Sequence, residues 1–215
     1  MAVTPTSPTI LSLPRELRDQ VYGYALLEPI VSVTPKLHHA PDFQNYPPAT
    51  QPGITKTNRQ LREETLPLFY SLNTFHMGLG NRTDRPLTKR WLRSLNADNI
   101  RHLRRIQLAT WTTTCLGNET GELWFWYVVG EVDLVSGGVE VETLFWENVD
   151  GHSLVPVKGN RDVLKARQSV EMIRSVLGSW AVGGVDREGI ERLMESFDGV
   201  CRRRDLPLVD RSDEF

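Results

Sequence analysis

The sequence has few cysteines and no long apolar run, and its first residues do not follow the pattern of a secretory leader. Cys115 and Cys201 are its only cysteines in 215 residues, too few for a disulfide framework and typical of reduced thiols. The longest apolar run, residues 123–129, is far shorter than the roughly 20 residues that span a membrane. The first nine residues lack the basic and apolar regions of a signal peptide. We therefore expect an intracellular protein, cytoplasmic or nuclear, that does not enter a membrane.

The residue patterns of metal and covalent chemistry are also missing. Of the five histidines only His38 and His39 are adjacent, and a structural zinc site needs two convergent pairs of ligands. The glycines at residues 78–81 (GLGN) lack the third glycine of a dinucleotide fingerprint, and no Gly-Lys-Ser/Thr follows them. No Gly-x-Ser-x-Gly elbow is present. The sequence predicts no metal, no cofactor and no catalytic residue, so we expect a protein that is not an enzyme. An enzyme of unrecognised type would instead need a deep pocket with convergent titratable groups.

Charge is divided unevenly along the chain. Residues 1–105 carry 14 lysines and arginines against 8 acidic residues, a net charge of +6, whereas residues 106–215 carry 11 against 19, a net charge of -8. This division indicates either an acidic partner for the first half or electrostatic docking of one half on the other. Both interpretations stay open.

Hydrophobic periodicity predicts alternating helical and extended segments. Residues 28–53 contain six prolines and read as a loop with a short strand at 30–33. Pro67 should kink or restart the second helix, with Thr65 or Leu66 at the joint, and residues 136–138 (Ser-Gly-Gly) suit a hairpin turn. Helices are predicted over residues 13–26, 54–72, 85–96, 160–182 and 187–204, and strands over 74–79, 104–110, 122–135 and 138–148.

These elements predict an α+β protein. A helical module at the N-terminus should pack on a small, mainly antiparallel sheet, which C-terminal helices close, with a βαβ-like passage between residues 74 and 110. The predicted organisation is a flexible tail (1–9), the helical module (10–76), an α+β domain (77–206) and a C-terminal tail (207–215).

The first helix has a clear apolar periodicity. Pro14 suits its first turn, and Ser12 can supply a capping oxygen. Apolar residues recur every fourth position, at Leu13, Leu17, Val21 and at residue 25. We expect this face to be buried and the charged residues between these positions to face solvent.

A basic cluster supports an alternative function. A nucleic-acid-associated factor would use such cations on phosphates, whereas a solvated helix face that neutralises the acidic half requires no ligand. We favour the second interpretation because the overall charge is negative and no nucleic-acid-binding motif accompanies the cluster. The cluster consists of Lys89, Arg90, Arg93, Arg101, Arg104 and Arg105.

The aromatic strand at residues 124–127 also has two interpretations. Alternation places Trp124 and Trp126 on one face and Phe125 and Tyr127 on the other. A core strand covered on both faces is the favoured interpretation, because surrounding acidic residues would repel the phosphates of stacked bases. An uncovered face would be a protein-binding patch.

Residues 12–26 (SLPRELRDQVYGYAL) followed by residues 54–75 (ITKTNRQLREETLPLFYSLNTF) resemble the fungal F-box-like proteins. In that family a Leu-Pro-x-Glu-Leu helix precedes an Asn/Cys-Arg-x-x-Arg-x-Glu helix that ends in Leu-Phe-Tyr. The resemblance covers about residues 10–76. The matching positions are Leu13, Pro14, Glu16, Leu17, Tyr22, Asn58, Arg59, Gln60, Arg62, Glu63, Leu68, Phe69, Tyr70 and Asn73.

The resemblance implies a non-enzymatic protein-interaction role. In F-box proteins a Skp adaptor of a cullin ubiquitin ligase holds the helical module, and the rest of the chain recruits the substrate. The implied partners are a Skp-type adaptor protein and an unknown target protein. The other interpretation of the module's apolar residues is that they pack on the rest of the chain. The adaptor-facing or module-core residues are Leu13, Pro14, Leu17, Val21, Leu68, Phe69 and Tyr70, and the target-binding residues are Trp124, Trp126 and Trp146.

Overall fold

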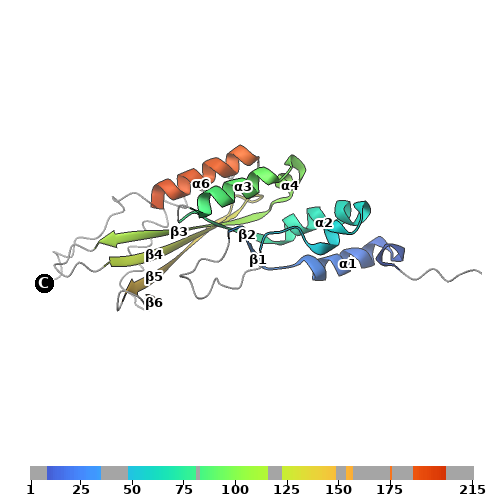
Figure 1. Ribbon diagram of the computed structural model, residues 1–215, viewed down its shortest axis with the longest axis horizontal. Coiled ribbons are helices and arrows are strands. Elements are labelled where there is room, and N and C mark those ends of the chain that lie inside the picture. Colours follow the sequence, from blue (N-terminus) through green and yellow to red (C-terminus); the bar gives the residue numbers. More distant parts are fainter. Residues whose placement is uncertain are drawn as a thin grey trace, which may run out of the picture.

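A computed structural model describes residues 9–34, 48–80, 83–115, 123–148, 154–156, 175 and 186–201; of residues 111–115, 123–127, 141–148, 154–156 and 200 it describes the backbone alone. One six-stranded sheet carries helices at one end and over one face (Figure 1). The elements in chain order are η1 (Ile10–Ser12), α1 (Arg15–Leu26), β1 (Ile30–Ser32), η3 (Gly53–Lys56), α2 (Arg59–Leu72), β2 (Thr74–Gly78), α3 (Asp84–Ser94), α4 (Ala97–His102), β3 (Arg105–Cys115), β4 (Leu123–Asp133), β5 (Val139–Asn148), β6 (Leu154–Pro156) and α6 (Arg187–Cys201).

The strands lie in the sheet in chain order, from β1 to β6. The predicted α+β class is confirmed. The pairings β3–β4, β4–β5 and β5–β6 are antiparallel, but the sheet as a whole is mixed because β1, β2 and β3 run parallel to one another. A parallel pair needs a crossover connection, and α3 and α4 supply it between β2 and β3. The expected βαβ passage is therefore present.

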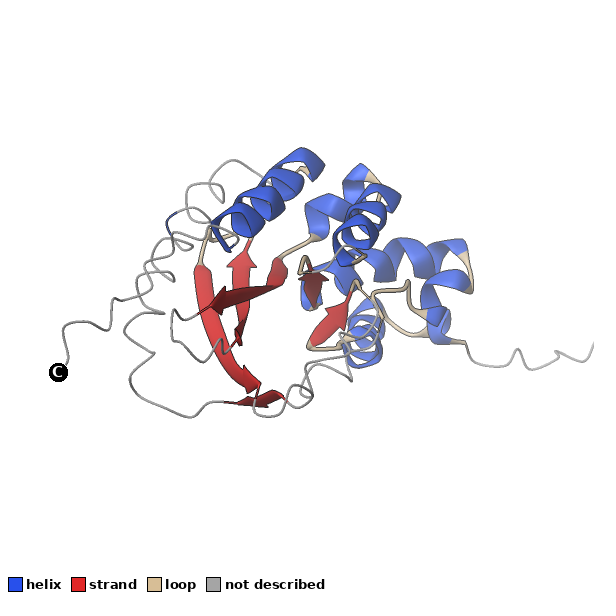
Figure 2. Cartoon of the chain, turned by 60° about the vertical axis from the view of Figure 1, so that its left-hand side comes forward, coloured by secondary structure: helices blue, strands red, loops and turns tan. Residues whose placement is uncertain are grey.

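The main core lies between the sheet and the helices α3, α4 and α6, which cover one face of it (Figure 2). Alternate residues of β2 and β3 point into this layer, as the period of two in a strand requires. The α6 helix closes it with the apolar face predicted for the last helix. Large side chains that are fully buried in this layer include Phe75, Met77, Leu79, Leu92, Leu103, Ile106, Leu108 and Phe197.

Two helix predictions are wrong. The helix predicted over residues 85–96 ends at Ser94, and Asn96 then begins α4, which the periodicity did not predict, by accepting a hydrogen bond from the Asn99 amide at 2.7 Å. The second is the restart expected at Pro67, because α2 is a single helix from Arg59 to Leu72 that contains Pro67. One lost backbone bond at Pro67 is tolerated because buried side chains anchor the helix on both sides of it, namely Leu61, Thr65, Leu66, Phe69 and Tyr70.

The turn chemistry follows the sequence closely. Gly137 has a φ of 73°, the left-handed conformation that glycine adopts without strain, and the turn joins antiparallel β4 and β5 as predicted. Asn58 caps α2, because its side chain accepts a hydrogen bond from the Leu61 amide at 2.8 Å.

Several predictions meet the limits of the described chain. Of the helix expected over 160–182 the structure describes residue 175 alone, as helical, and of the predicted tails 1–9 and 207–215 it describes residue 9 alone. The expected division at 76/77 falls within β2. Strand β6 was not predicted.

Cys201 is a buried free thiol, and burial raises its pKa to about 12. Among the described helices none is both long and apolar enough to cross a bilayer.

Candidate docking surface on the first helix

The apolar face predicted to be buried on α1 is the exposed one. Tyr22 and Leu26 are the side chains that α1 buries, and they pack against Leu61 of α2. Tyr24 is 90% exposed, and the other four members of the opposite face are 37% to 53% exposed. We call this face the α1 surface; it consists of Leu13, Leu17, Val21, Tyr24 and Leu27. The prediction of its burial is wrong because α1 rests on α2 through polar side chains as well as apolar ones.

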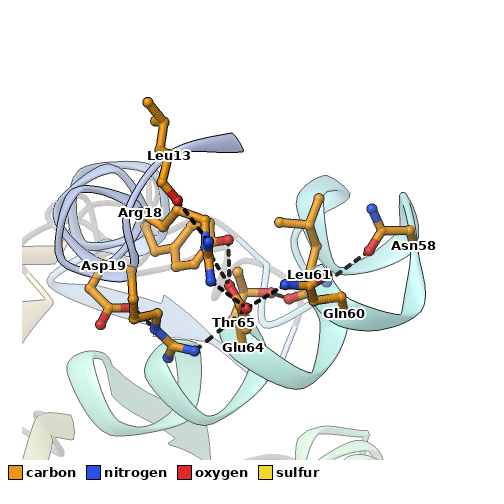
Figure 3. A network of polar contacts seen from close by, with 10 residues as sticks. Leu13, Arg18, Asp19, Asn58, Gln60, Leu61, Glu64 and Thr65 are labelled. Carbon is orange, nitrogen blue, oxygen red and sulfur yellow. Dashed lines mark hydrogen bonds and ion pairs between the residues drawn. The ribbon is translucent and has the colours of Figure 1, made fainter. Parts of the chain in front are cut away.

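The polar contacts between α1 and α2 converge on the carboxylate of Glu64 (Figure 3). Arg18 donates to both of its oxygens, at 3.1 Å from Nε and 3.0 Å from Nη2. The Tyr22 hydroxyl donates to Oε2 at 2.7 Å, and Gln60 donates to Oε1 at 3.0 Å. The Arg15 guanidinium adds an ion pair at 3.5 Å. The side chain of Glu64 on α2 thus binds three residues of α1, namely Arg15, Arg18 and Tyr22.

This carboxylate is strongly acidic. Hydrogen bonds from Gln60, Tyr22 and Arg18 lower the pKa of Glu64 from its ordinary 4.5 to about 2, against the opposing effect of burial. Burial, and then the bond to Glu64, raises the pKa of Tyr22. Glu64 is therefore ionised at any physiological pH.

The acid stability of the module should depend on Glu64. Because its folded pKa is lower than its unfolded pKa, the stabilisation is complete above about pH 4.5 and is lost as the pH falls toward 2. We expect the difference in free energy of unfolding between wild type and Glu64→Gln to stay constant from pH 7 to about pH 5 and then to shrink as the pH falls to 3, as measured in urea titrations.

The neighbouring variant Glu63→Gln is the control for that titration, since the ion pair that the described residues give Glu63 is with exposed Arg59 at 2.8 Å. Its difference from wild type should stay under about 1 kcal/mol at each pH. A Glu64→Gln difference that does not change with pH would contradict the expectation.

The start of α1 differs from the sequence expectation. Pro14 stands at the N-cap position, and no side chain caps the helix. The Ser12 hydroxyl instead donates to the Thr9 carbonyl at 2.6 Å, so the predicted capping role of Ser12 is wrong. Arg18 donates from Nη1 to the Leu13 carbonyl at 2.8 Å. The residue that binds Glu64 therefore also fixes the first member of the α1 surface.

The remaining predicted adaptor residues differ in their exposure to solvent. Pro14 is exposed, and Leu68 is half-buried beside the Tyr22 cluster. Phe69 and Tyr70 are core residues, each 2% exposed, with ring centroids 5.3 Å apart. The structure thus brings Leu13, Leu17 and Val21 together on one accessible face, whereas Phe69 and Tyr70 are buried in the main core.

The predicted target-binding residues are described by their backbone alone. Trp124 and Trp126 lie on β4 and Trp146 on β5, as the strand predictions require. The register pairs Trp146 with Phe125, whereas Trp126 pairs with Phe145. The three tryptophans therefore occupy different rows of the sheet, and their role in target binding stays a prediction.

Two of the six members of the basic cluster lie against acidic residues of α6. Lys89 contacts Glu195 at 2.8 Å and Arg93 contacts Glu191 at 3.3 Å. Arg85, one turn earlier on α3, reaches Asp198 at 3.1 Å. Basic α3 is thus paired with α6 of the acidic half, which supports electrostatic docking of one half on the other.

The other members of the basic cluster are dispersed. Arg101 pairs with Asp98 on its own helix at 3.7 Å, and Arg105 donates to the Leu72 carbonyl at 3.2 Å. Arg90 lines an open hollow of about 500 Å³ on α3, and Arg104 is exposed beside β3. A nucleic-acid function would depend chiefly on these last two arginines.

A buried histidine was not recognised from the sequence. His76 Nδ1 lies 3.4 Å from Gln107 Oε1, and Gln107 donates to Glu131 at 2.8 Å across three paired strands. Burial lowers the pKa of His76 to about 4, so its imidazole is neutral and suits a structural role. No group of three or more metal-ligating side chains occurs among the residues the structure describes.

No protein-family model, curated protein or solved structure matches this chain. The geometry of the α1 surface and the sequence resemblance are the grounds for a functional proposal.

Proposed function

We propose that this chain is a non-enzymatic protein-interaction subunit that docks through the α1 surface onto a Skp-type adaptor and recruits a target protein. The observation that carries the proposal is the orientation of α1, whose apolar side chains face solvent while its charged residues Arg15 and Arg18 bind Glu64 of α2. Exposed apolar side chains gathered on one face typically mark a protein-binding site.

The spacing of the α1 surface suits recognition in a groove. Leu13, Leu17, Val21 and Tyr24 follow one another at intervals of four, four and three residues, which aligns them along one side of the helix. Helices bound in hydrophobic grooves present anchors with this spacing. Among the described side chains, Val135 is the one other exposed large hydrophobic residue, so the apolar exposure is concentrated on α1.

The motif residues of the F-box-like resemblance divide into two groups. Tyr22, Asn58 and Asn73 hold the module together through hydrogen bonds. Leu13 and Leu17 are free for contact. One group of motif residues therefore stabilises the helical module, and the other leaves one of its faces accessible. A subunit that is held by an adaptor requires both. A target held beside the ligase would be modified because its effective concentration is raised, without a catalytic residue in this chain.

The direct test is binding of the full-length chain to a purified Skp-type adaptor. A carboxylate at position 17 would be buried without a partner in an apolar groove, so we expect Leu17→Asp to weaken binding at least tenfold while the circular dichroism spectrum and melting temperature change little. Isothermal titration calorimetry or co-purification measures the loss.

Thr57→Asp is the matched control, since it adds the same charge at an exposed position outside the α1 surface; its affinity should equal that of wild type. The proposal fails if the folded wild type does not bind the adaptor, or if Leu17→Asp binds as tightly as wild type.

A further inference from the structure

The α1 helix has two apolar faces, and hydrophobic burial alone does not choose between them. Tyr22 and Leu26 are buried against Leu61, but the α1 surface offers more apolar side chains that burial would remove from water. Because burial of apolar area is favourable in proportion to its extent, rolling α1 about its axis to bury Leu17 and Val21 would be a competing arrangement. Some other interaction must exclude it.

Glu64 is placed to exclude that arrangement. Its side chain is 9% exposed, and that of Arg18, which donates to both of its oxygens, is 12% exposed. Its contacts to Arg15, Arg18 and Tyr22 lie along one side of α1 over two turns. A rotation that buried Leu17 would carry all three α1 donors away from the carboxylate. Of the donors described here, the partly buried charge would keep only Gln60, on its own helix, and would lose its cationic partners, which is costly.

We propose that Glu64 is a positioning residue that fixes which face of α1 points to solvent. Ion pairs that are mostly buried add little net stability compared with apolar replacements, and their best-attested role is to select one register among competing ones. Arg18 extends this control to the Leu13 carbonyl. The effect of Glu64 on docking rests on the function proposed above. Its effect on the orientation of α1 does not depend on that function, so the orientation is tested without a binding partner.

The test uses the labelling rate of a cysteine placed on the α1 surface. The full chain carries Leu17→Cys in a Cys115→Ser background, and Cys201 is buried. A water-soluble maleimide is reacted with this protein and with versions that add Glu64→Leu, Glu64→Gln or Glu63→Leu. Glu64→Leu preserves volume and removes every polar contact, Glu64→Gln keeps an acceptor oxygen, and Glu63→Leu is the control on the exposed side of α2.

We expect Glu64→Leu to slow labelling at least tenfold, Glu64→Gln to slow it less, and Glu63→Leu to leave it unchanged. An unchanged rate in Glu64→Leu would overturn the proposal, and so would a faster rate, because it would mean that Glu64 only attaches α1 to α2. In parallel, Glu64→Leu with the native Leu17 should lose adaptor affinity. The two proposals can fail separately. If Glu64→Leu slows labelling but the wild-type chain does not bind the adaptor, the role of Glu64 is upheld and only the proposed function is rejected.

Discussion

Phe75→Ala is expected to lower the free energy of unfolding by about 3–5 kcal/mol, the usual cost of truncating a fully buried aromatic side chain. Phe75 is 0% exposed. Its ring centroid lies 5.6 Å from those of Phe69 and Tyr70 on α2 and 5.3 Å from that of Trp91 on α3. The side chain therefore joins β2 to two helices, and the cavity left by alanine would border all three elements.

Urea unfolding followed by circular dichroism measures this loss. Phe75→Leu should cost less because it retains most of the apolar volume. Val135→Ala is the control, since Val135 is 60% exposed, and should change stability by no more than about 0.5 kcal/mol. A Phe75→Ala protein as stable as Val135→Ala would show that this cluster does not anchor the fold.

The second large effect is expected at Asn73. This side chain is fully buried and makes three hydrogen bonds to the backbone: its Nδ2 donates to the carbonyls of Leu26 at 2.9 Å and Phe69 at 2.8 Å, and its Oδ1 accepts from the Glu28 amide at 2.7 Å. Asn73→Ala leaves three backbone groups without this partner, and the bonds to two of them, the carbonyls of Leu26 and Phe69, are buried. We expect a loss of about 2–4 kcal/mol, since an unsatisfied buried polar group costs about 1–3 kcal/mol.

Asn73→Asp separates the donor and acceptor roles. Aspartate keeps the acceptor for Glu28 but places a carboxylate against two carbonyl oxygens, so it should destabilise at least as much as alanine. Ser71→Ala, which removes one half-buried hydroxyl bond to the Leu68 carbonyl at 3.1 Å, should cost about 1 kcal/mol or less. The prediction is wrong if Asn73→Ala and Ser71→Ala lower the melting temperature by the same amount.

Periodicity predicted the α+β class and most elements, but it could not orient α1. Leu13, Leu17 and Val21 form the more regular stripe, while the buried pair is Tyr22 and Leu26. The deciding contact joins Arg18 to a residue 46 positions later in the chain, and no local pattern records such a partner. Adjacent glutamates at 63 and 64 are equivalent in sequence; only the packing of α1 on α2 distinguishes them.

The sheet shows the same limit. Alternation identified its long strands, but parallel or antiparallel pairing depends on how the chain crosses between them, and the crossover through α3 and α4 was only partly predicted. The α4 helix was missed although Asn96 carries a capping signal, because six residues are too few for an apolar period to emerge. The ion pairs between α3 and α6 agree with the charge division, since the opposite charges of the two halves favoured such contact.

The distance in sequence between Arg18 and Glu64 has a consequence during synthesis of the chain. At about 5–20 residues per second, α1 precedes its α2 partner by about 2–9 seconds. Throughout that interval both apolar faces of α1 lack their folded environment, and nothing yet distinguishes the face that will be buried from the one that will stay exposed. The newly made α1 segment should therefore be open to non-native apolar contacts until Glu64 has been synthesised and α2 can form.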